Sequence, residues 1–130
     1  MSISAGVAIV IALALLEYMV MGLLVGRARG QYKVDAPATT GNPIFERYFR
    51  VHQNTLENLI IFVPAVWLFS QFVNNSLAIA LGVIFIVGRI IYAVGYINEP
   101  NKRVPGVLIS GVVNIVLVLG IVIWIFIDSV

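Results

Sequence analysis

Four apolar stretches, each long enough or nearly long enough to cross a membrane, occupy most of this 130-residue chain. They are residues 3–26, 59–73, 77–95 and 104–127. A spanning helix needs about 20 apolar residues, because each residue adds only about 1.5 Å to its length. Only 11% of the residues are charged and the mean hydropathy is +1.03, which lies outside the range of soluble globular domains. The sequence therefore predicts an all-α integral membrane protein, a four-helix bundle in which residues 1–130 form a single domain.

The limits of the helices follow from breaker and capping residues. We expect helices over about residues 3–28, 44–73, 77–97 and 104–127. The first is not expected to be a cleaved secretory signal, because no basic segment precedes it and its apolar core is too long. Pro64 should be tolerated within the second helix, as prolines are in membrane helices. Ser76 is the predicted N-cap of the third helix, and Pro105 suits the first turn of the fourth.

Basic residues are distributed unevenly over the connections between these helices. The first connection is surrounded by Arg27, Arg29, Lys33, Arg47 and Arg50, and the third carries Lys102 and Arg103, whereas the second connection and both termini have no Lys or Arg. Loops rich in Lys and Arg stay in the cytoplasm. We therefore expect the first and third connections to face the cytoplasm and both termini to lie on the opposite side. The net charge of +2 then reflects topology, and nucleic-acid binding is not expected.

A polar stripe marks the first half of the second helix. Arg47, Arg50, Asn54 and Glu57 are separated by 3, 4 and 3 positions, so a helix places them on one face. This segment precedes the apolar part of the helix and should lie at the cytoplasmic interface. The stripe thus predicts one wall of a polar site.

The third helix carries a second stripe, formed by Arg89, Tyr92 and Tyr96 at separations of 3 and 4. An arginine inside an apolar segment costs several kcal/mol unless it faces a partner or a wet cavity. Glu57 is the predicted counter-charge of Arg89. Together the two stripes predict a pocket walled by arginine, carboxylate, amide and phenol; the alternative is a buried ion pair that only fixes the helix register.

The residue types in this pocket favour a small peptide with excess negative charge. Guanidinium groups bind carboxylates, a carboxylate binds an amine, and an asparagine suits a peptide bond. Glutathione fits that description and is the expected co-substrate. No metal site is expected, because the chain has one histidine and no cysteine.

Two segments and a loop resemble a known family. "ERYFRVHQNTLEN" (46–58), "GRIIYAVGYINEPNKR" (88–103) and "TTG" (39–41) look like the membrane-associated proteins in eicosanoid and glutathione metabolism, the MAPEG family. This resemblance implies a four-helix protomer that forms a homotrimer, with glutathione bound between neighbouring protomers. It implies that glutathione is bound by Arg50, Asn54, Glu57, Tyr92 and Tyr96, with contributions from the buried Arg89, from Arg29 of a neighbouring protomer and from His52, where relatives vary.

The resemblance assigns the catalytic role to Arg103. A thiol with a pKa of about 8.5 is mostly protonated at neutral pH, and a nearby guanidinium favours the thiolate. The thiolate could then attack a lipophilic electrophile from the membrane lipid, or reduce a lipid hydroperoxide, which describes a detoxifying glutathione transferase with a possible peroxidase activity. Glu99 lies four positions before Arg103 and is expected to neutralise part of its charge.

Two other functions remain open from the sequence. Glu17 lies near the middle of the first apolar stretch, where a charge is expensive and by default functional. In that respect the chain is similar to small multidrug-resistance transporters, in which such a carboxylate exchanges protons for a cationic drug; a carboxyl that only holds helices together is the alternative for Glu17. The third possibility is a lipid-binding scaffold without catalysis of its own.

Overall fold

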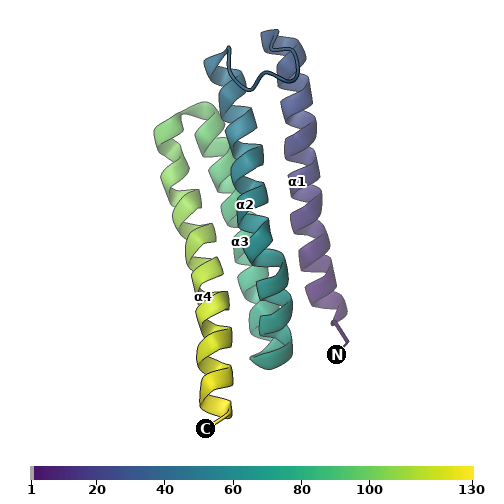
Figure 1. Cartoon of the computed structure of the whole chain (residues 1–130), viewed down its shortest axis with the longest axis vertical. Helices are drawn as coiled ribbons and strands as arrows, with labels where there is room; N and C mark the ends of the chain where they lie inside the picture. Colours follow the sequence, from purple (N-terminus) through teal and green to yellow (C-terminus); the bar gives the residue numbers. More distant parts are fainter. Residues whose placement is uncertain (1) are drawn as a thin grey trace.

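The computed structural model describes residues 2–130, which form four long α helices and one short 3-10 turn, packed side by side (Figure 1). Within this range there is no strand, which confirms the predicted all-α class. Each of the four helices is long and apolar enough to cross a membrane. The elements are α1 (Ala5–Tyr32), α2 (Pro43–Phe72), α3 (Asn75–Asn98), η1 (Pro100–Arg103) and α4 (Val104–Asp128).

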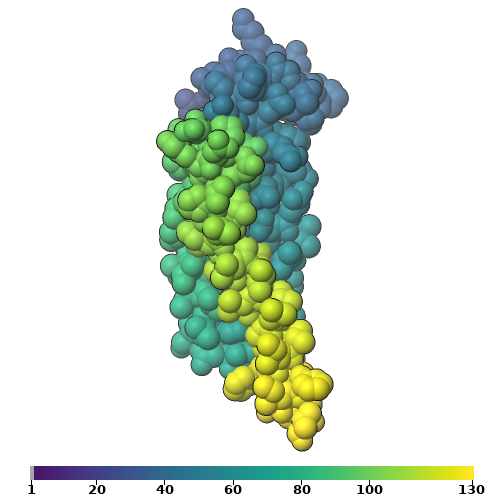
Figure 2. Space-filling view, turned by 90° about the vertical axis from the view of Figure 1, so that its left-hand side faces the viewer, coloured from purple at the N-terminus to yellow at the C-terminus, as the bar shows by residue number. Residues whose placement is uncertain are grey.

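The connections that carry the basic residues lie at one end of the bundle. In Figure 1 the α1–α2 connection and the turn between α3 and α4 are at the top, while both chain ends and the α2–α3 turn are at the bottom. Figure 2 shows α4 running along one face, with its last residues projecting beyond the other helices. The end with the basic connections is called the connection end below.

Asparagine side chains start two of the helices. Asn42 accepts hydrogen bonds from the backbone N–H groups of Ile44 and Phe45, directly before Pro43 at the first helical position. Asn74 does the same for α3, accepting from the N–H of Leu77 at 2.8 Å. The prediction that Ser76 caps this helix was wrong. Asn and Ser are about equally good caps, and the earlier residue of the two begins the helix.

The other helix limits depend on backbone geometry. α1 continues to Tyr32, four residues past the expected limit, and Lys33 ends it in the left-handed region with φ of 57°. α2 passes through Pro64 without a break. Pro105 lies in the first turn of α4, as predicted. Because α2 extends from Pro43 to Phe72, its polar first half reaches the connection end.

Helices α3 and α4 touch through glycines near the connection end. A Cβ atom on Gly106 of α4 would lie 2.4 Å from the backbone N of Tyr92, and one on Gly95 of α3 would lie 2.3 Å from the carbonyl oxygen of Lys102. Real Cβ atoms essentially never come this close to backbone atoms. The missing side chains therefore allow α3, η1 and the start of α4 to pack as one block that carries Tyr92 and Tyr96.

We expect Gly106→Ala to destabilise the protein by about 1–3 kcal/mol, because the new methyl group must push α3 and α4 apart. Gly111→Ala is the matched control on the same helix, since a Cβ there meets nothing within 4 Å. That control should be neutral or slightly stabilising, because glycine inside a helix costs up to about 1 kcal/mol relative to alanine. Thermal unfolding in detergent measures both variants, and an equal effect of the two would contradict the close packing.

Candidate active site

Two neighbouring hollows open at the connection end. The first, called the polar pocket, has a volume of about 210 Å³ and is lined by Arg50, Gln53, Asn54, Glu57, Tyr92, Tyr96 and Arg103. The second, called the loop groove, has a volume of about 650 Å³ and shares Arg50 and Tyr96 with the first. Its remaining lining includes Thr39, Thr40 and Glu46. The two hollows thus form adjacent parts of one surface.

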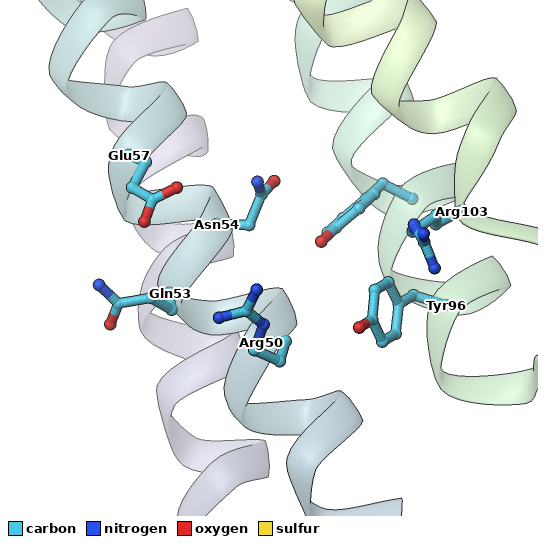
Figure 3. Close-up of a pocket in the computed structure, with 7 residues that line it drawn as sticks. Arg50, Gln53, Asn54, Glu57, Tyr96 and Arg103 are labelled. Carbon is cyan, nitrogen blue, oxygen red and sulfur yellow. The ribbon is translucent and has the colours of Figure 1, made fainter. Parts of the chain in front are cut away.

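The polar pocket lies between two walls, which Figure 3 shows from the side. One wall is α2, with Arg50, Asn54 and Glu57 on it; the other carries Tyr96 and Arg103. The structure thus brings together six of the residues that the sequence and the resemblance point to, namely Arg50, Asn54, Glu57, Tyr92, Tyr96 and Arg103. Gln53 was missed, although its position three residues after Arg50 and four before Glu57 places it on the same helical face.

Arg103 is held at the edge of the pocket by its own turn. Its Nη1 donates a hydrogen bond to the carbonyl oxygen of Pro100 at 2.9 Å, and its guanidinium lies 5.5 Å from the centre of the Tyr96 ring. The side chain is exposed, so its remaining donors can reach a ligand. The 3-10 turn therefore presents Arg103 to the pocket.

Glu99 does not neutralise Arg103, contrary to the expectation from the sequence. Within residues 2–130 the single ion pair joins Glu99 to Lys102, with 3.6 Å between Oε2 and Nζ. Both of these side chains are more than half exposed. Lys102 is therefore the cation that Glu99 pairs with, and the charge of Arg103 is free to act on the pocket.

Arg89 is almost completely buried behind the polar pocket. It is 1% exposed and donates hydrogen bonds to Ser110 Oγ at 3.1 Å, Asn54 Oδ1 at 2.8 Å and Thr55 Oγ1 at 2.8 Å. Its guanidinium carbon also lies 4.2 Å from the centre of the Tyr92 ring. The network thus links α2, α3 and α4.

The prediction that Glu57 is the counter-charge of Arg89 was wrong, because no ion pair joins them in the described chain. Glu57 is exposed and lines the polar pocket. Arg89 points into the bundle instead, where Thr55 and Ser110 provide hydroxyl acceptors. Each of these two is a small polar residue inside an apolar helix, which is only a weak signal in the sequence, and neither was predicted from the sequence as a partner of Arg89.

Arg89 also decides how Asn54 can meet a ligand. A guanidinium has only donors, so the amide oxygen of Asn54 must face Arg89. The amide N–H₂ group then remains for the pocket. The hydrogen-bond network continues from Asn54 deeper into the bundle. Asn58 donates to Asn54 Oδ1 at 3.2 Å, and Asn114 donates to Asn58 Oδ1 at 3.3 Å.

Besides the buried Arg89, three residues of the predicted binding set or of the α2 stripe do not line the polar pocket. Arg47 donates to the carbonyl oxygens of Ile97 and Asn98 and so caps the last turn of α3. His52 stacks on Tyr18 of α1, with 4.3 Å between ring centres. Arg29 donates to the carbonyl oxygen of Ala38 at 2.7 Å and orders the α1–α2 connection. Neither Arg29 nor His52 lines the polar pocket of its own chain.

The charges of the pocket favour an anion that also carries an amine. Arg50 and Arg103 supply two positive charges from opposite walls, and Glu57 supplies one negative charge. Tyr92, Tyr96 and the amide of Asn54 add neutral hydrogen-bonding groups. This set suits a small molecule with carboxylates, an ammonium group and an amide.

Comparison with known proteins decides the family. The family model of the MAPEG family matches residues 7–123. The chain belongs to the MAPEG family. Among curated MAPEG relatives, microsomal glutathione S-transferase 2 of Homo sapiens is 41% identical over 99 residues, which are 75% of this chain and 67% of that protein.

Two further similarities extend this result. An uncharacterized protein of Synechocystis sp. is 44% identical over 113 residues, 87% of this chain and 82% of that protein. Leukotriene C4 synthase of Cavia porcellus is 31% identical over 96 residues, 74% of this chain and 64% of that protein. The resemblance expected from the sequence is thereby confirmed, and so is the four-helix membrane fold of a MAPEG protein.

Removing one acceptor of the buried guanidinium should cost stability. We expect Thr55→Val, which keeps the side-chain shape, to destabilise the protein by about 1.5–3 kcal/mol, because the hydrogen bond to a charged group is lost in a buried site. Thr40→Val, in the exposed connection, is the matched control and should change the unfolding free energy by less than about 0.5 kcal/mol. Thermal unfolding measures both, and a neutral Thr55→Val would contradict the importance of this bond.

Proposed function

We propose that this MAPEG protein is a membrane-bound glutathione transferase that holds glutathione in the polar pocket and activates its thiol through Arg103. The observation that carries this proposal is the placement of Arg50 and Arg103 on opposite walls of one pocket, with Asn54 and Glu57 on the same wall as Arg50. The family, and the similarity to proteins named as glutathione transferase and leukotriene C4 synthase, support the same substrate.

Glutathione is complementary to the pocket group by group. It has two carboxylates, one ammonium group and two peptide bonds, and so has excess negative charge. The guanidinium of Arg50 can bind a carboxylate in bidentate fashion. Glu57 can accept hydrogen bonds from the ammonium group, and the N–H₂ of Asn54 can donate to a peptide carbonyl, because its oxygen is already bound by Arg89.

Arg103 is the proposed catalytic residue because it combines exposure, fixed position and an unneutralised charge. A guanidinium near the sulfur stabilises the thiolate relative to the thiol, and the thiolate is the nucleophile. In conjugation, the sulfur forms a bond to an electrophilic carbon while a leaving group departs or the product takes up a proton. Tyr92 or Tyr96 can donate a hydrogen bond to the sulfur or to the departing group.

The proposed substrates are lipophilic, because the residues that line the pocket belong to, or directly adjoin, helices that are long and apolar enough to cross a membrane. An apolar electrophile dissolved in the bilayer would reach the thiolate from the side. The same thiolate also suits a peroxidase reaction, in which two glutathione molecules are oxidised to the disulfide while a lipid hydroperoxide is reduced to an alcohol and water. We place the connection end in the cytoplasm, because the basic residues gather there.

We further propose that the functional unit is a homotrimer with sites between protomers. Arg29 and His52 support this arrangement, since neither lines the polar pocket of its own chain. A neighbouring copy could bring either residue to a bound ligand. The pocket of one protomer would then be completed by α1 or α2 of the next.

Arg103→Ala should separate binding from activation. We expect the Kd of the variant for glutathione to stay within a few-fold of the wild-type value, because Arg50 and Glu57 remain. The thiolate absorbance band at neutral pH should disappear. Turnover should fall at least tenfold, which corresponds to a loss of about 1.4 kcal/mol of thiolate stabilisation. Ultraviolet difference absorbance during a glutathione titration measures the first, and conjugation of a lipophilic aryl halide measures the second.

The double substitution Glu99→Gln with Lys102→Ala is the matched control, since it removes a pair in the same turn whose charges cancel and which lies outside the pocket. It should keep both the thiolate band and the turnover. Absence of any glutathione binding by the wild type would sink the proposed function. Saturable binding without a thiolate band or turnover in the wild type would favour the scaffold alternative.

Complementation between damaged protomers tests the shared site. We expect Arg29→Ala and Arg103→Ala proteins to be weakly active alone, and mixed trimers from co-expression to regain part of the activity. The physical reason is that some interfaces of a mixed trimer combine an intact Arg29 with an intact Arg103. Two differently tagged chains, purified in tandem, provide the mixed assembly for the turnover assay; mixed trimers no more active than the pure ones would contradict a site built by two protomers.

A further inference from the structure

Glu17 is the one polar residue in an otherwise apolar hollow between α1 and α3. The hollow has a volume of about 390 Å³, and its other lining residues are Leu, Val, Met, Ile and Ala, among them Leu16 and Ile90. It shares no lining residue with the polar pocket. A transporter path for a cationic drug needs further polar groups along the way, and this hollow has none. Glu17 therefore requires another explanation.

The carboxyl group of Glu17 has no hydrogen-bond partner. Both Oε1 and Oε2 are buried, and neither meets a donor in the described chain. A carboxyl group in the middle of a membrane helix is expensive unless it is paired. Its surroundings in the hollow offer no donor, so an ionised Glu17 needs a compensating charge from beyond the residues that line the hollow.

Arg89 lacks the complementary partner, an acceptor of opposite charge. Its three hydrogen bonds all go to neutral acceptors, and its Nε is buried without a partner. No carboxylate lies within ion-pair distance in residues 2–130. Glu17 lines its hollow together with Ile86 and Ile90, which lie on either side of Arg89 in the sequence of α3, so Glu17 lies at the same depth of the bundle as Arg89. At this depth, α3 thus carries a buried donor without an acceptor, and α1 carries two buried acceptors without a donor.

We propose that Glu17 is the counter-charge of Arg89 and, through it, a positioning residue of the glutathione pocket. Arg89 holds the amide oxygen of Asn54 at 2.8 Å and lies 4.2 Å from the ring centre of Tyr92, and both of these residues line the polar pocket. The carboxylate of Glu17 attracts the guanidinium from the α1 side. The proposal rests on the proposed function for its effect on glutathione, but the pairing itself does not.

The physical consequence concerns the balance of forces on one guanidinium. With Glu17 present, Arg89 is attracted toward α1 and stays behind the pocket. Without this charge, the unbalanced cation is drawn toward Glu57 and the water of the pocket, and Asn54 loses the orientation that directs its N–H₂ group to the ligand. Glutathione binding should then weaken although Glu17 itself touches no ligand.

A double-mutant cycle tests this inference on the full-length protein in detergent. The variants are Glu17→Gln, Arg89→Gln and the combination, with Val20→Ala as the matched control that removes bulk from the same hollow without changing a charge. Arg89→Met, which also removes the positive charge, replaces Arg89→Gln if the latter fails to fold. The readouts are the glutathione Kd from thiolate absorbance and the melting temperature.

We expect Glu17→Gln to raise the Kd for glutathione about threefold to tenfold, which lies within the range of coupling that neighbouring residues show. In the Arg89 variant the same substitution should add no further increase, and the melting temperature should fall no further. Val20→Ala should leave the Kd unchanged. An unchanged Kd in Glu17→Gln, or equal increases in both backgrounds, overturns the positioning role.

The melting temperatures separate this inference from the proposed function. If the wild type binds no glutathione, the proposed function and the positioning role both fail. The pairing is then still decided by the cycle of melting temperatures, because additive losses overturn it and non-additive losses support it. Glu17→Asp, which keeps the charge, should retain more of the coupling than Glu17→Gln.

Discussion

A guanidinium buried among membrane helices is the constraint on which the rest of this structure depends. Arg89 cannot be left without acceptors in a medium that offers no water, so three helices must meet around it. Thr55 and Asn54 fix α2 to α3, and Ser110 fixes α4 to both. The polar pocket is the outer surface of this junction, because Asn54 and Tyr92 belong to the junction and also line the pocket. The stability of the bundle and the proposed binding of glutathione therefore depend on the same side chains.

The pocket also requires that α3, η1 and α4 pack closely, and glycines allow this close approach. Tyr92, Tyr96 and Arg103 can share one wall only if the α3–η1–α4 turn is tight, and Gly95 and Gly106 allow backbone to approach backbone there. The opposite wall needs no such device, since a single helix presents Arg50, Asn54 and Glu57 at regular intervals. One wall of the pocket thus follows from the regular spacing of residues along a single helix, and the other follows from the close packing of α3, η1 and α4.

This difference explains what the sequence could predict. The four helices follow from long apolar stretches, and the α2 wall follows from spacing alone, so both could be read without a structure. The partners of Arg89 could not, because a charge of opposite sign at Glu57 was the obvious choice, while the actual acceptors are hydroxyl groups on two different helices. Ion pairing within the turn was likewise invisible: Glu99 could pair with Lys102 or Arg103, and only the geometry of η1 selects Lys102. The capping of α3 by Asn74 rather than Ser76 is another choice between equal candidates.

The pair of Glu99 and Lys102 has a consequence for the speed of ligand entry. Because these two charges cancel each other at the surface, the mouth of the pocket keeps the excess positive charge of Arg50 and Arg103 over Glu57. An anion approaching through water is attracted by this field over roughly one Debye length, about 8–10 Å at physiological ionic strength. Added salt shortens that range and slows capture, whereas contacts made after docking are screened much less. The turn between α3 and α4 thereby sets the electrostatic field at the mouth as well as the shape of the pocket.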